Sequence, residues 1–361
     1  MPASSIGTRL SLLLLGLLAA ALALAETPSW HPDRYTLGQG LQFPQQDLTV
    51  GGYATLKYSN LDAQAWQFSV NTLSLFLSKT LTKRWQLFSE IEVGDALRYS
   101  RDNFTTSDAE FDLERLYADY HLRRGISIRF GKFLTPVGRW NLIHADPLVW
   151  TTDRPLSTSA PFARHATGAM LYGDLTLGAN SLDYMLYADD SELLDPAQQN
   201  ELAFEDDTSG LSPHNAFKHA AGARLSYSLL NDALQLGASY VRFKMSDLLD
   251  KQELIGADAL LTVKGLEFSG EWFYRNSLGS AEPDEHGGFV QAVLPLVQRF
   301  YLVGRREKYH AATLPPTATI NVIGVTYRPH PAVSIKLEYR GGEHNDIVAP
   351  SGWLGSLAIL F

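Results

Sequence analysis

The chain of 361 residues contains no cysteine. That absence excludes disulfide scaffolds, zinc-ribbon metal sites and thiol nucleophiles. Basic residues are also few, because 30 Lys and Arg face 39 Asp and Glu and leave a net charge of −9. A general nucleic-acid binder would need a basic surface. The sequence therefore predicts neither cysteine chemistry nor a nucleic-acid partner.

Long apolar runs are missing after residue 25. The longest, such as residues 357–361, have about five members, whereas a membrane helix needs about 20. A mean hydropathy of −0.10 would ordinarily indicate a soluble globular protein. Whether the protein is soluble or membrane-embedded therefore depends on the order of its apolar residues along the chain.

The N-terminus has the features of an export signal. Arg9 is the only charge in the first 25 residues, and the apolar or small run 12–25 ends in Ala23-Leu24-Ala25. We expect a signal peptide over residues 1–25 that is cleaved after Ala25; the alternative, a membrane anchor, needs a longer run. Cleavage leaves 336 residues and, without Arg9, a net charge of −10. A cysteine-free exported chain fits a bacterial envelope protein.

Beyond the signal, apolar and polar residues alternate over long stretches. Examples are residues 115–122, 234–240, 266–275 and 333–340. A period of two indicates β-strands, and runs of about ten residues exceed an average globular strand.

Short and long connections between these stretches also alternate. Seven short turns and eight longer loops predict about sixteen strands. We therefore expect an all-β, antiparallel, up-and-down transmembrane barrel over residues 48–361, preceded by a short periplasmic segment, 26–47. A secreted β-sandwich or solenoid also alternates. Long loops on one side only, an even strand count and aromatic residues near strand ends favour the barrel.

The C-terminal strand carries a resemblance to a known signal. In residues 352–361, Leu357, Ile359 and Phe361 alternate up to a terminal phenylalanine. This pattern resembles the C-terminal signal of Gram-negative outer-membrane barrels, which the barrel-assembly machinery reads. The resemblance implies an integral outer-membrane location, with lipid and lipopolysaccharide as neighbours.

A second resemblance covers residues 131–155, which open with Gly131-Lys132-Phe133-Leu134-Thr135-Pro136. This stretch is similar to the segment after the fifth strand in porins of the phosphate-selective O/P type. The resemblance implies sixteen strands, a third loop folded into the lumen and a homotrimer. The lysine cluster of that group does not carry over, because no lysine lies between Lys132 and Lys218.

A barrel of this size leaves an aqueous channel, so we expect passive diffusion of small hydrophilic solutes or ions, anions among them. The third loop, residues 134–164, is the predicted constriction. An external lid or a trimer contact are the alternatives for this loop. Its charged residues are predicted to line the pore: Arg139, Asp146, Asp153, Arg154 and Arg164.

Charged strand residues are expected to face the lumen, because Arg or Lys on the lipid face costs about 2–4 kcal/mol at the midplane. The predicted lumen wall consists of Arg115, Arg129, Arg224, Arg242, Arg275, Arg305, Arg340, Glu267 and Glu271. For any single one of these, a structural ion pair is favoured over a solute contact.

No cofactor, metal site or enzymatic activity is predicted. The acidic stretch 189–207 lacks the spacing of an EF-hand and is expected to be a solvated external loop. An outer-membrane phospholipase, deacylase or protease is the alternative class. His121, His165 and His219 lie on or beside strands, but no Gly-x-Ser-x-Gly or His-Glu-x-x-His motif accompanies them.

Overall fold

The computed structural model describes residues 35–101, 103–106, 109–143, 145–158, 161–196, 216–246, 248–279, 283–311 and 314–361. The predicted signal peptide, residues 1–25, and positions 197–207 of the acidic stretch lie outside this range. Over the described residues, no helix is both long and apolar enough to span a membrane.

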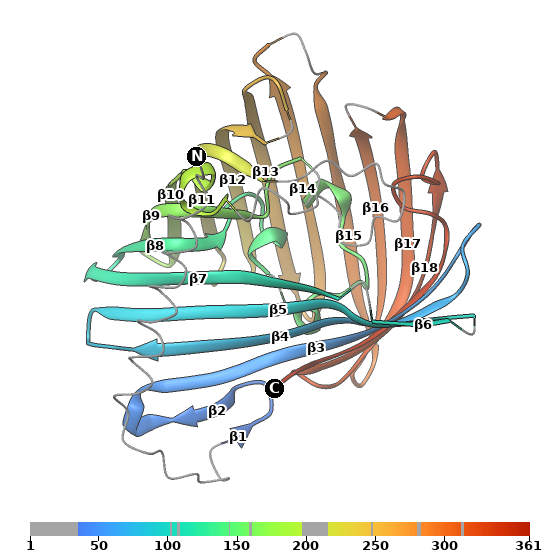
Figure 1. Cartoon of the computed structure of the whole chain (residues 1–361), viewed down its shortest axis with the longest axis horizontal. Helices are drawn as coiled ribbons and strands as arrows, with labels where there is room; N and C mark the ends of the chain where they lie inside the picture. The colour runs from blue at the N-terminus through green and yellow to red at the C-terminus, as the bar shows by residue number, and fades with distance from the viewer. Residues whose placement is uncertain are drawn as a thin grey trace, which may run out of the picture.

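Sixteen antiparallel strands close into a barrel, which confirms the predicted fold class. Each strand pairs with its neighbours in the chain, and the last pairs with the first, so that the C-terminus lies beside β3 in Figure 1. The strands are β3 (Leu48–Leu61), β4 (Gln67–Thr80), β5 (Trp85–Ser100), β7 (Glu110–Arg123), β8 (Ile126–Leu134), β9 (His165–Leu177), β10 (Asn180–Asp189), β11 (Phe217–Leu229), β12 (Leu234–Met245), β13 (Gln252–Val263), β14 (Leu266–Ser277), β15 (Glu285–Val297), β16 (Phe300–Ala311), β17 (Leu314–His330), β18 (Val333–Glu343) and β19 (Gly352–Leu360).

Three short strands complete the sheet: β1 (Tyr35–Thr36), β2 (Gly40–Phe43) and β6 (Asn103–Thr105). β2 pairs with residues 48–50 of β3, whereas β19 pairs with β3 from Tyr53 onward. β2 therefore covers the part of the β3 edge that β19 leaves open, so that backbone groups there are not left unpaired.

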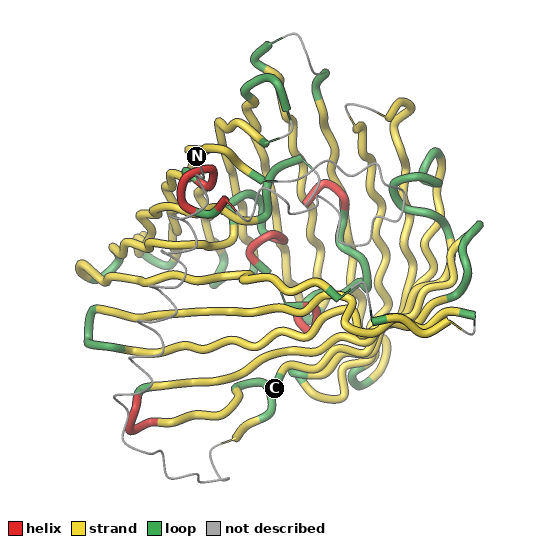
Figure 2. The backbone as a smooth tube through the Cα atoms, in the orientation of Figure 1, coloured by secondary structure: helices red, strands yellow, loops and turns green. Residues whose placement is uncertain are grey.

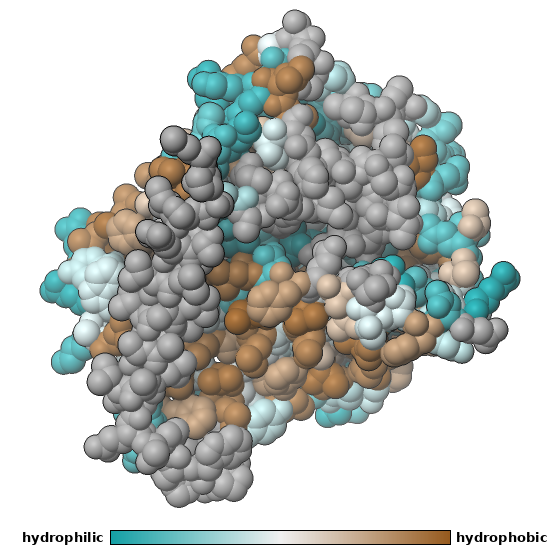
Figure 3. Space-filling view, viewed as in Figure 1, coloured by the Kyte–Doolittle hydropathy of each residue, from teal (hydrophilic) through white to brown (hydrophobic). Residues whose placement is uncertain are grey.

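Inward and outward positions alternate along the strands except at register shifts, because successive side chains of a regular strand point to opposite faces. On β12, Leu236 and Tyr240 are exposed, whereas Ser239, Val241 and Phe243 are buried. Hydrophobic residues such as Leu73 and Leu75 of β4 form the outer surface, and Figure 3 shows them gathered over β4 and β5. The outer face is thus the lipid-facing one.

Several strands extend further than the alternation indicates. From the alternation alone, we expect a longer loop over residues 309–317, but the ends of β16 and β17 occupy it and remain paired up to Ala311 and Leu314. The alternation likewise predicts a short turn over residues 173–178, but Gly173 is still paired with Tyr184, so the turn lies at residues 178–179. Backbone hydrogen bonds continue there although the side-chain alternation weakens.

Between β8 and β9, the described residues 135–143, 145–158 and 161–164 run inside the barrel, as the predicted fold class requires. We call this segment loop 3. It contains three short 3-10 helices, η3 (Trp140–Leu142), η4 (Asp146–Leu148) and η5 (Leu156–Thr158). Figure 2 shows short helical turns enclosed by the strands. η4 contacts β3, β18 and β19, and η5 contacts β14 and β15.

Candidate functional site

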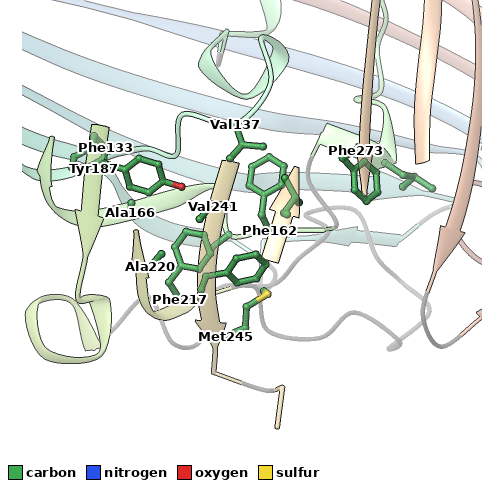
Figure 4. Packing of buried hydrophobic residues seen from close by; sticks show 14 of the residues in the cluster. Phe133, Val137, Phe162, Ala166, Tyr187, Phe217, Ala220, Val241, Met245 and Phe273 are labelled. Atoms are coloured by element: carbon green, nitrogen blue, oxygen red, sulfur yellow. The ribbon is translucent and has the colours of Figure 1, made fainter. Parts of the chain in front are cut away.

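Loop 3 is fixed to the inner wall by a hydrophobic cluster. Val137 and Phe162 of the loop belong to the same buried cluster as Phe217 of β11, Val241 of β12 and Phe273 of β14. Figure 4 shows these side chains gathered between the loop and the strands. Each of them is at most 3% exposed, so the two ends of the loop are held by apolar burial.

Carboxylates of the wall accept hydrogen bonds from the loop. Glu271 Oε1 accepts from the backbone N–H of Arg139 at 2.9 Å and of Trp140 at 2.5 Å. Glu338 Oε2 accepts from Thr152 N at 2.9 Å, and Glu307 Oε1 accepts from Ser157 N at 2.9 Å. Glu267 Oε1 accepts from the Trp150 indole at 3.0 Å. An irregular segment inside a barrel needs such partners for its backbone groups, and charged acceptors make the stronger bonds.

Cations of the wall bind the carbonyl groups of the same loop. Lys336 Nζ donates to Asp146 O at 2.9 Å and to Thr151 O at 3.1 Å. Arg305 Nη1 donates to Thr151 Oγ1 at 2.7 Å and to Asp153 O at 2.9 Å. Wall charges of both signs therefore position loop 3.

The lowest part of the loop reaches the level of the short turns. Arg328, two residues before the end of β17, donates to Leu148 O at 3.1 Å and lies 3.7 Å above the Trp150 ring. That ring also contacts Tyr301, the second residue of β16. Loop 3 thus spans most of the depth of the lumen.

Asp153 is neutralised by two cations. Its carboxylate lies 2.9 Å from Lys57 Nζ and also bonds the Arg340 guanidinium. Burial opposes ionisation, but the charges of Lys57 and Arg340 outweigh it and lower the pKa of Asp153 well below its usual range. Asp153 therefore joins loop 3 to β3 and β18 on either side of the barrel seam.

Arg164 is likewise paired and buried. It lies 3.0 Å from Glu114, whose Oε1 is also 3.0 Å from His165 Nε2. Arg139 lies elsewhere, beside a cavity of about 60 Å³ between the loop and β13–β15 that Trp140 and Phe289 also line. The predicted constriction residues thus do not form one ring.

Arg154 and Asp146 are the two remaining predicted constriction residues, and Asp146 begins η4, which contacts β3, β18 and β19. Arg154 Nη2 donates to Asn141 Oδ1 at 3.5 Å. Burial and the neighbouring Arg164 lower the pKa of Arg154 to about 9, while Asp146 and Glu114 oppose that shift. Arg154 therefore stays a cation at neutral pH, with Asp146 on the same loop and Glu114 on the wall as its anionic surroundings.

Four of the predicted wall arginines form ion pairs on the barrel interior. Arg115 Nε lies 2.5 Å from Glu90, and Arg129 makes a bidentate pair with Asp119 at 2.8 and 2.9 Å. Arg224 pairs with Asp258, and Arg275 pairs with Glu285. The other four inward residues, Arg305, Arg340, Glu267 and Glu271, contact loop 3 as described above.

Arg242 does not face the lumen, and its assignment to the wall is wrong. It shares the outward phase of β12 with Leu236 and Tyr240, its side chain is 58% exposed, and its Nε lies 3.8 Å from Glu253. Arg242 lies three residues from the end of β12 at the longer loops, where charge on the outer face costs little. The position of Arg242 near the end of its strand therefore explains why this charged residue can lie on the outer face.

Opposite loop 3, the wall carries a stack of flat side chains that the sequence pattern did not reveal. Phe76 and Phe88 are 6.1 Å apart between ring centroids and inclined by 20°, and Phe88 and Tyr117 are 5.1 Å apart and inclined by 19°. The Arg129 guanidinium lies 3.6 Å from the Tyr117 centroid. Alternation put each residue on the inner face, but only the strand register makes them neighbours.

The sequence also missed Lys57, Glu114 and Glu307 as partners of the loop. Glu114 and Arg115 are consecutive yet both contact inner residues, because the register of β5 and β7 shifts between Glu90 and Glu92. A bulge of this kind breaks strict alternation. A search for a period of two therefore does not identify Glu114 as an inner residue.

The predicted assembly residues lie at the seam. Leu357, Ile359 and Phe361 share the outward phase with exposed Trp353 of β19. The backbone of Phe361 exchanges hydrogen bonds of 2.7 and 2.8 Å with Gly52 of β3. Recognition of this strand by the assembly machinery stays a prediction.

Comparisons with known proteins agree with this architecture. No known family profile matches the chain. An uncharacterized protein of Aquifex aeolicus (strain VF5) is 24% identical over 349 residues, which cover 84% of this chain and 77% of that protein.

Similar solved structures include OmpT, an outer membrane protein of Vibrio cholerae, studied with its loop L8 deleted. The match has a TM-score of 0.58 at 9% sequence identity, and the matched residues make up 87% of this chain and 99% of the OmpT chain. An anion-selective porin from Comamonas acidovorans has a TM-score of 0.57 at 12% identity, covering 87% and 98%. A triple mutant of the Rh. blastica porin has a TM-score of 0.54 at 11% sequence identity, and the match covers 87% of this chain and 100% of that porin. At these identities the likeness is one of fold, and the chain has the fold of an outer-membrane porin barrel.

Proposed function

We propose that the protein is an outer-membrane porin, which forms a water-filled channel for passive diffusion of small hydrophilic solutes or ions. The observation that carries this proposal is loop 3, which runs inside the barrel and is bound to the wall by charges of both signs. A loop fixed in this way narrows a lumen without a moving part, and its position sets the pore size.

Ion preference in this proposal depends on Arg154. Asp153 and Arg164 are paired, and Arg139 borders a separate cavity. Within the part of the chain that the structure describes, Arg154 makes a long hydrogen bond to Asn141 and no ion pair, and a cation there favours passage of anions. Phosphate selectivity is not part of the proposal, because the lysine cluster of the O/P group is missing.

Assembly in this proposal follows the resemblance: a cleaved signal peptide, insertion by the assembly machinery through the C-terminal strand, and a homotrimer in contact with lipid and lipopolysaccharide. One of the solved OmpT structures is a trimer form, which is compatible with a trimer here.

Conductance in planar lipid bilayers tests the channel. We expect an ohmic, water-filled conductance from the refolded protein. No conductance together with esterase or protease activity would refute the channel and favour the enzyme alternative. The control for that alternative is Ser127→Ala, because Ser127 Oγ lies 2.9 Å from His121 Nδ1 on the inner wall.

Arg154→Ala tests the selectivity. We expect the reversal potential under a salt gradient to move toward cation preference by a few millivolts to tens of millivolts, because a lumenal cation is removed. Arg139→Ala is the matched control and should leave the potential unchanged. Equal shifts in both variants would contradict the assignment of Arg154 as the selective residue.

A further inference from the structure

The outer face of β16 carries an unusual row of charge. Arg306, Lys308 and His310 occupy successive outward positions, whereas Arg305, Glu307 and Tyr309 between them are buried on the inner side. Arg306 and Lys308 are exposed. These are the strand positions that face lipid elsewhere on the barrel.

Neighbouring strands add a second histidine and no acid. His286 of β15 stands opposite His310, with 4.9 Å between the ring centroids. We call Arg306, Lys308, His310 and His286 the β16 patch. The residues opposite Arg306 and Lys308 on the two adjoining strands are Val290, Gly288, Asn321 and Thr319, none of which is a carboxylate.

Outward carboxylates lie at the margin of the patch. Asp284 accepts a 2.5 Å hydrogen bond from Tyr274. Glu343 lies two strands away from Lys308, across Thr319. Among the described ion pairs, neither carboxylate is joined to Arg306 or Lys308, so the patch keeps its positive charge although the whole chain has a net charge of −9.

The depth of the patch sets the kind of partner. Arg306 lies six residues beyond the start of β16. With a rise of about 3.3 Å per residue and a tilt of about 45°, this places Arg306 about 14 Å above the short turns and Lys308 nearly 5 Å higher. The apolar band of such barrels is about 25 Å tall. Both backbone positions therefore lie in the outer-leaflet half of this band, where an unpaired charge against acyl chains is unfavourable. Long arginine and lysine side chains extend from such positions toward the headgroups, where the phosphate groups lie.

We propose that the β16 patch binds the phosphate groups of an outer-leaflet glycolipid, the phosphorylated lipid anchor of lipopolysaccharide. The Arg306 guanidinium can bind a phosphate group through two hydrogen bonds, and the Lys308 ammonium can bind one as a single compact charge. Exposed Val290 lies directly opposite Arg306, and exposed Ile323 lies opposite Gly304, nearer the short turns, so they provide apolar surface for acyl chains. A contact between two copies of this chain is the competing interpretation.

Native mass spectrometry of the refolded protein tests the proposal, with hexa-acylated lipid A carrying two phosphates as the probe. We expect the variant R306Q/K308Q to bind this lipid about 25-fold more weakly, since each cation near a membrane surface contributes about fivefold. R242Q is the matched control, because Arg242 is also outward but is paired with Glu253; it should change binding less than twofold. Unchanged conductance and heat-modifiable gel mobility report that each variant folds.

Two further measurements use the unaltered protein and therefore do not depend on how the variants fold. Unaltered protein should bind dephosphorylated lipid A far more weakly than the phosphorylated form, and inorganic phosphate at equal concentration should not compete. Equal binding of the two lipids, or competition by inorganic phosphate, would overturn the assignment. Loss of oligomer in R306Q/K308Q with unchanged lipid binding would overturn it as well and would identify the patch as a protomer contact.

Discussion

At the scale of single residues, the charged side chains of this barrel act mainly on the protein itself. Glu271, Glu338 and Lys336 each bind backbone groups of loop 3, and Arg129 pairs with Asp119 on the wall. A buried charge is unfavourable unless it is paired and hydrogen-bonded. The lumen therefore combines a high density of charge with few charges that are free to meet a solute.

Asp153→Asn should loosen loop 3, because it leaves Lys57 and Arg340 without their shared carboxylate. We expect a loss of about 3 kcal/mol in the free energy of unfolding at pH 7, measured by urea denaturation in detergent micelles. Asp62→Asn, at an exposed carboxylate between β3 and β4, is the control.

The same residue predicts a pH dependence. The pKa of Asp153 is lower in the folded protein than its unfolded value of about 3.9. Its stabilising effect is therefore complete above about pH 4 and is lost as the pH falls further toward the folded pKa. The difference in stability between wild type and Asp153→Asn should stay constant from pH 8 to 5 and shrink below pH 4. A difference that shrinks already at pH 6 would contradict this mechanism.

Gly138→Ala tests how closely the loop approaches the wall. Gly138 has φ of +64°, and an added Cβ would lie 2.2 Å from Glu271 Oε2. We expect a loss of about 2–3 kcal/mol, from backbone strain and from displacement of the carboxylate that binds Arg139 and Trp140. Gly178→Ala is the matched control: its φ is +69°, but no atom lies within 4 Å of the added Cβ. Only the strain of about 1 kcal/mol should remain there, and equal losses would mean that the contact with Glu271 is unimportant.

At the scale of elements, loop 3 consists of three short 3-10 helices joined by irregular backbone, and its partners lie on β3, on β7 and on strands from β11 to β19. The hydrophobic cluster around Phe162 holds its ends, and the wall charges hold its middle. Because the two kinds of contact are independent, the middle of the loop can loosen while the ends stay in place.

The double variant Glu271→Gln/Glu338→Gln should show this separation. Each amide still offers an acceptor oxygen but lacks the charge, so each hydrogen bond weakens by about 1 kcal/mol. We expect greater open-channel current noise with the barrel intact, measured in single-channel recordings. Glu253→Gln, at an outward position on β13, should leave the noise unchanged. Quiet channels in the double variant would show that the wall carboxylates do not hold the loop.

At the scale of the whole molecule, stability depends on closing the sheet on itself. β19 pairs with β3 from Gly352 to Leu360, and the backbone of Phe361 adds two more hydrogen bonds to Gly52. A closed barrel has no free edge, and every backbone group facing lipid is paired.

Deletion of Phe361 should therefore affect assembly more than the finished barrel. We expect a several-fold lower amount of folded protein in the outer membrane, measured by heat-modifiable mobility on gels, since the terminal residue of the predicted signal is lost. Refolding into detergent should still succeed, because the pairs from Gly352 to Leu360 remain. Phe300→Ala, at the outward start of β16, controls for the loss of one aromatic residue, and an equal loss in both variants would contradict a special role for the C-terminus.

Much of this architecture could be predicted from residue order. Strand number, the alternation of inward and outward faces and the inward course of loop 3 follow from the period of two, the connection lengths and the family resemblance. Arg242 shows where the charge rule fails: the period of two places it outward, and the cost of charge on the outer face depends on height along the strand. Glu114 shows a second failure, because a bulge changes the phase locally.

Residue order alone excludes cysteine chemistry and shows that apolar residues alternate with polar ones in strands long enough for a barrel. Local periodicity carries that information, because each side chain's face depends only on its neighbours in the chain. Which charges meet became apparent only in the folded barrel, where Asp153 contacts Lys57 and Arg340. In the same way, only the strand register shows that no carboxylate lies directly opposite Arg306 and Lys308. Those contacts join residues far apart in the chain, and their register is fixed only when the barrel closes.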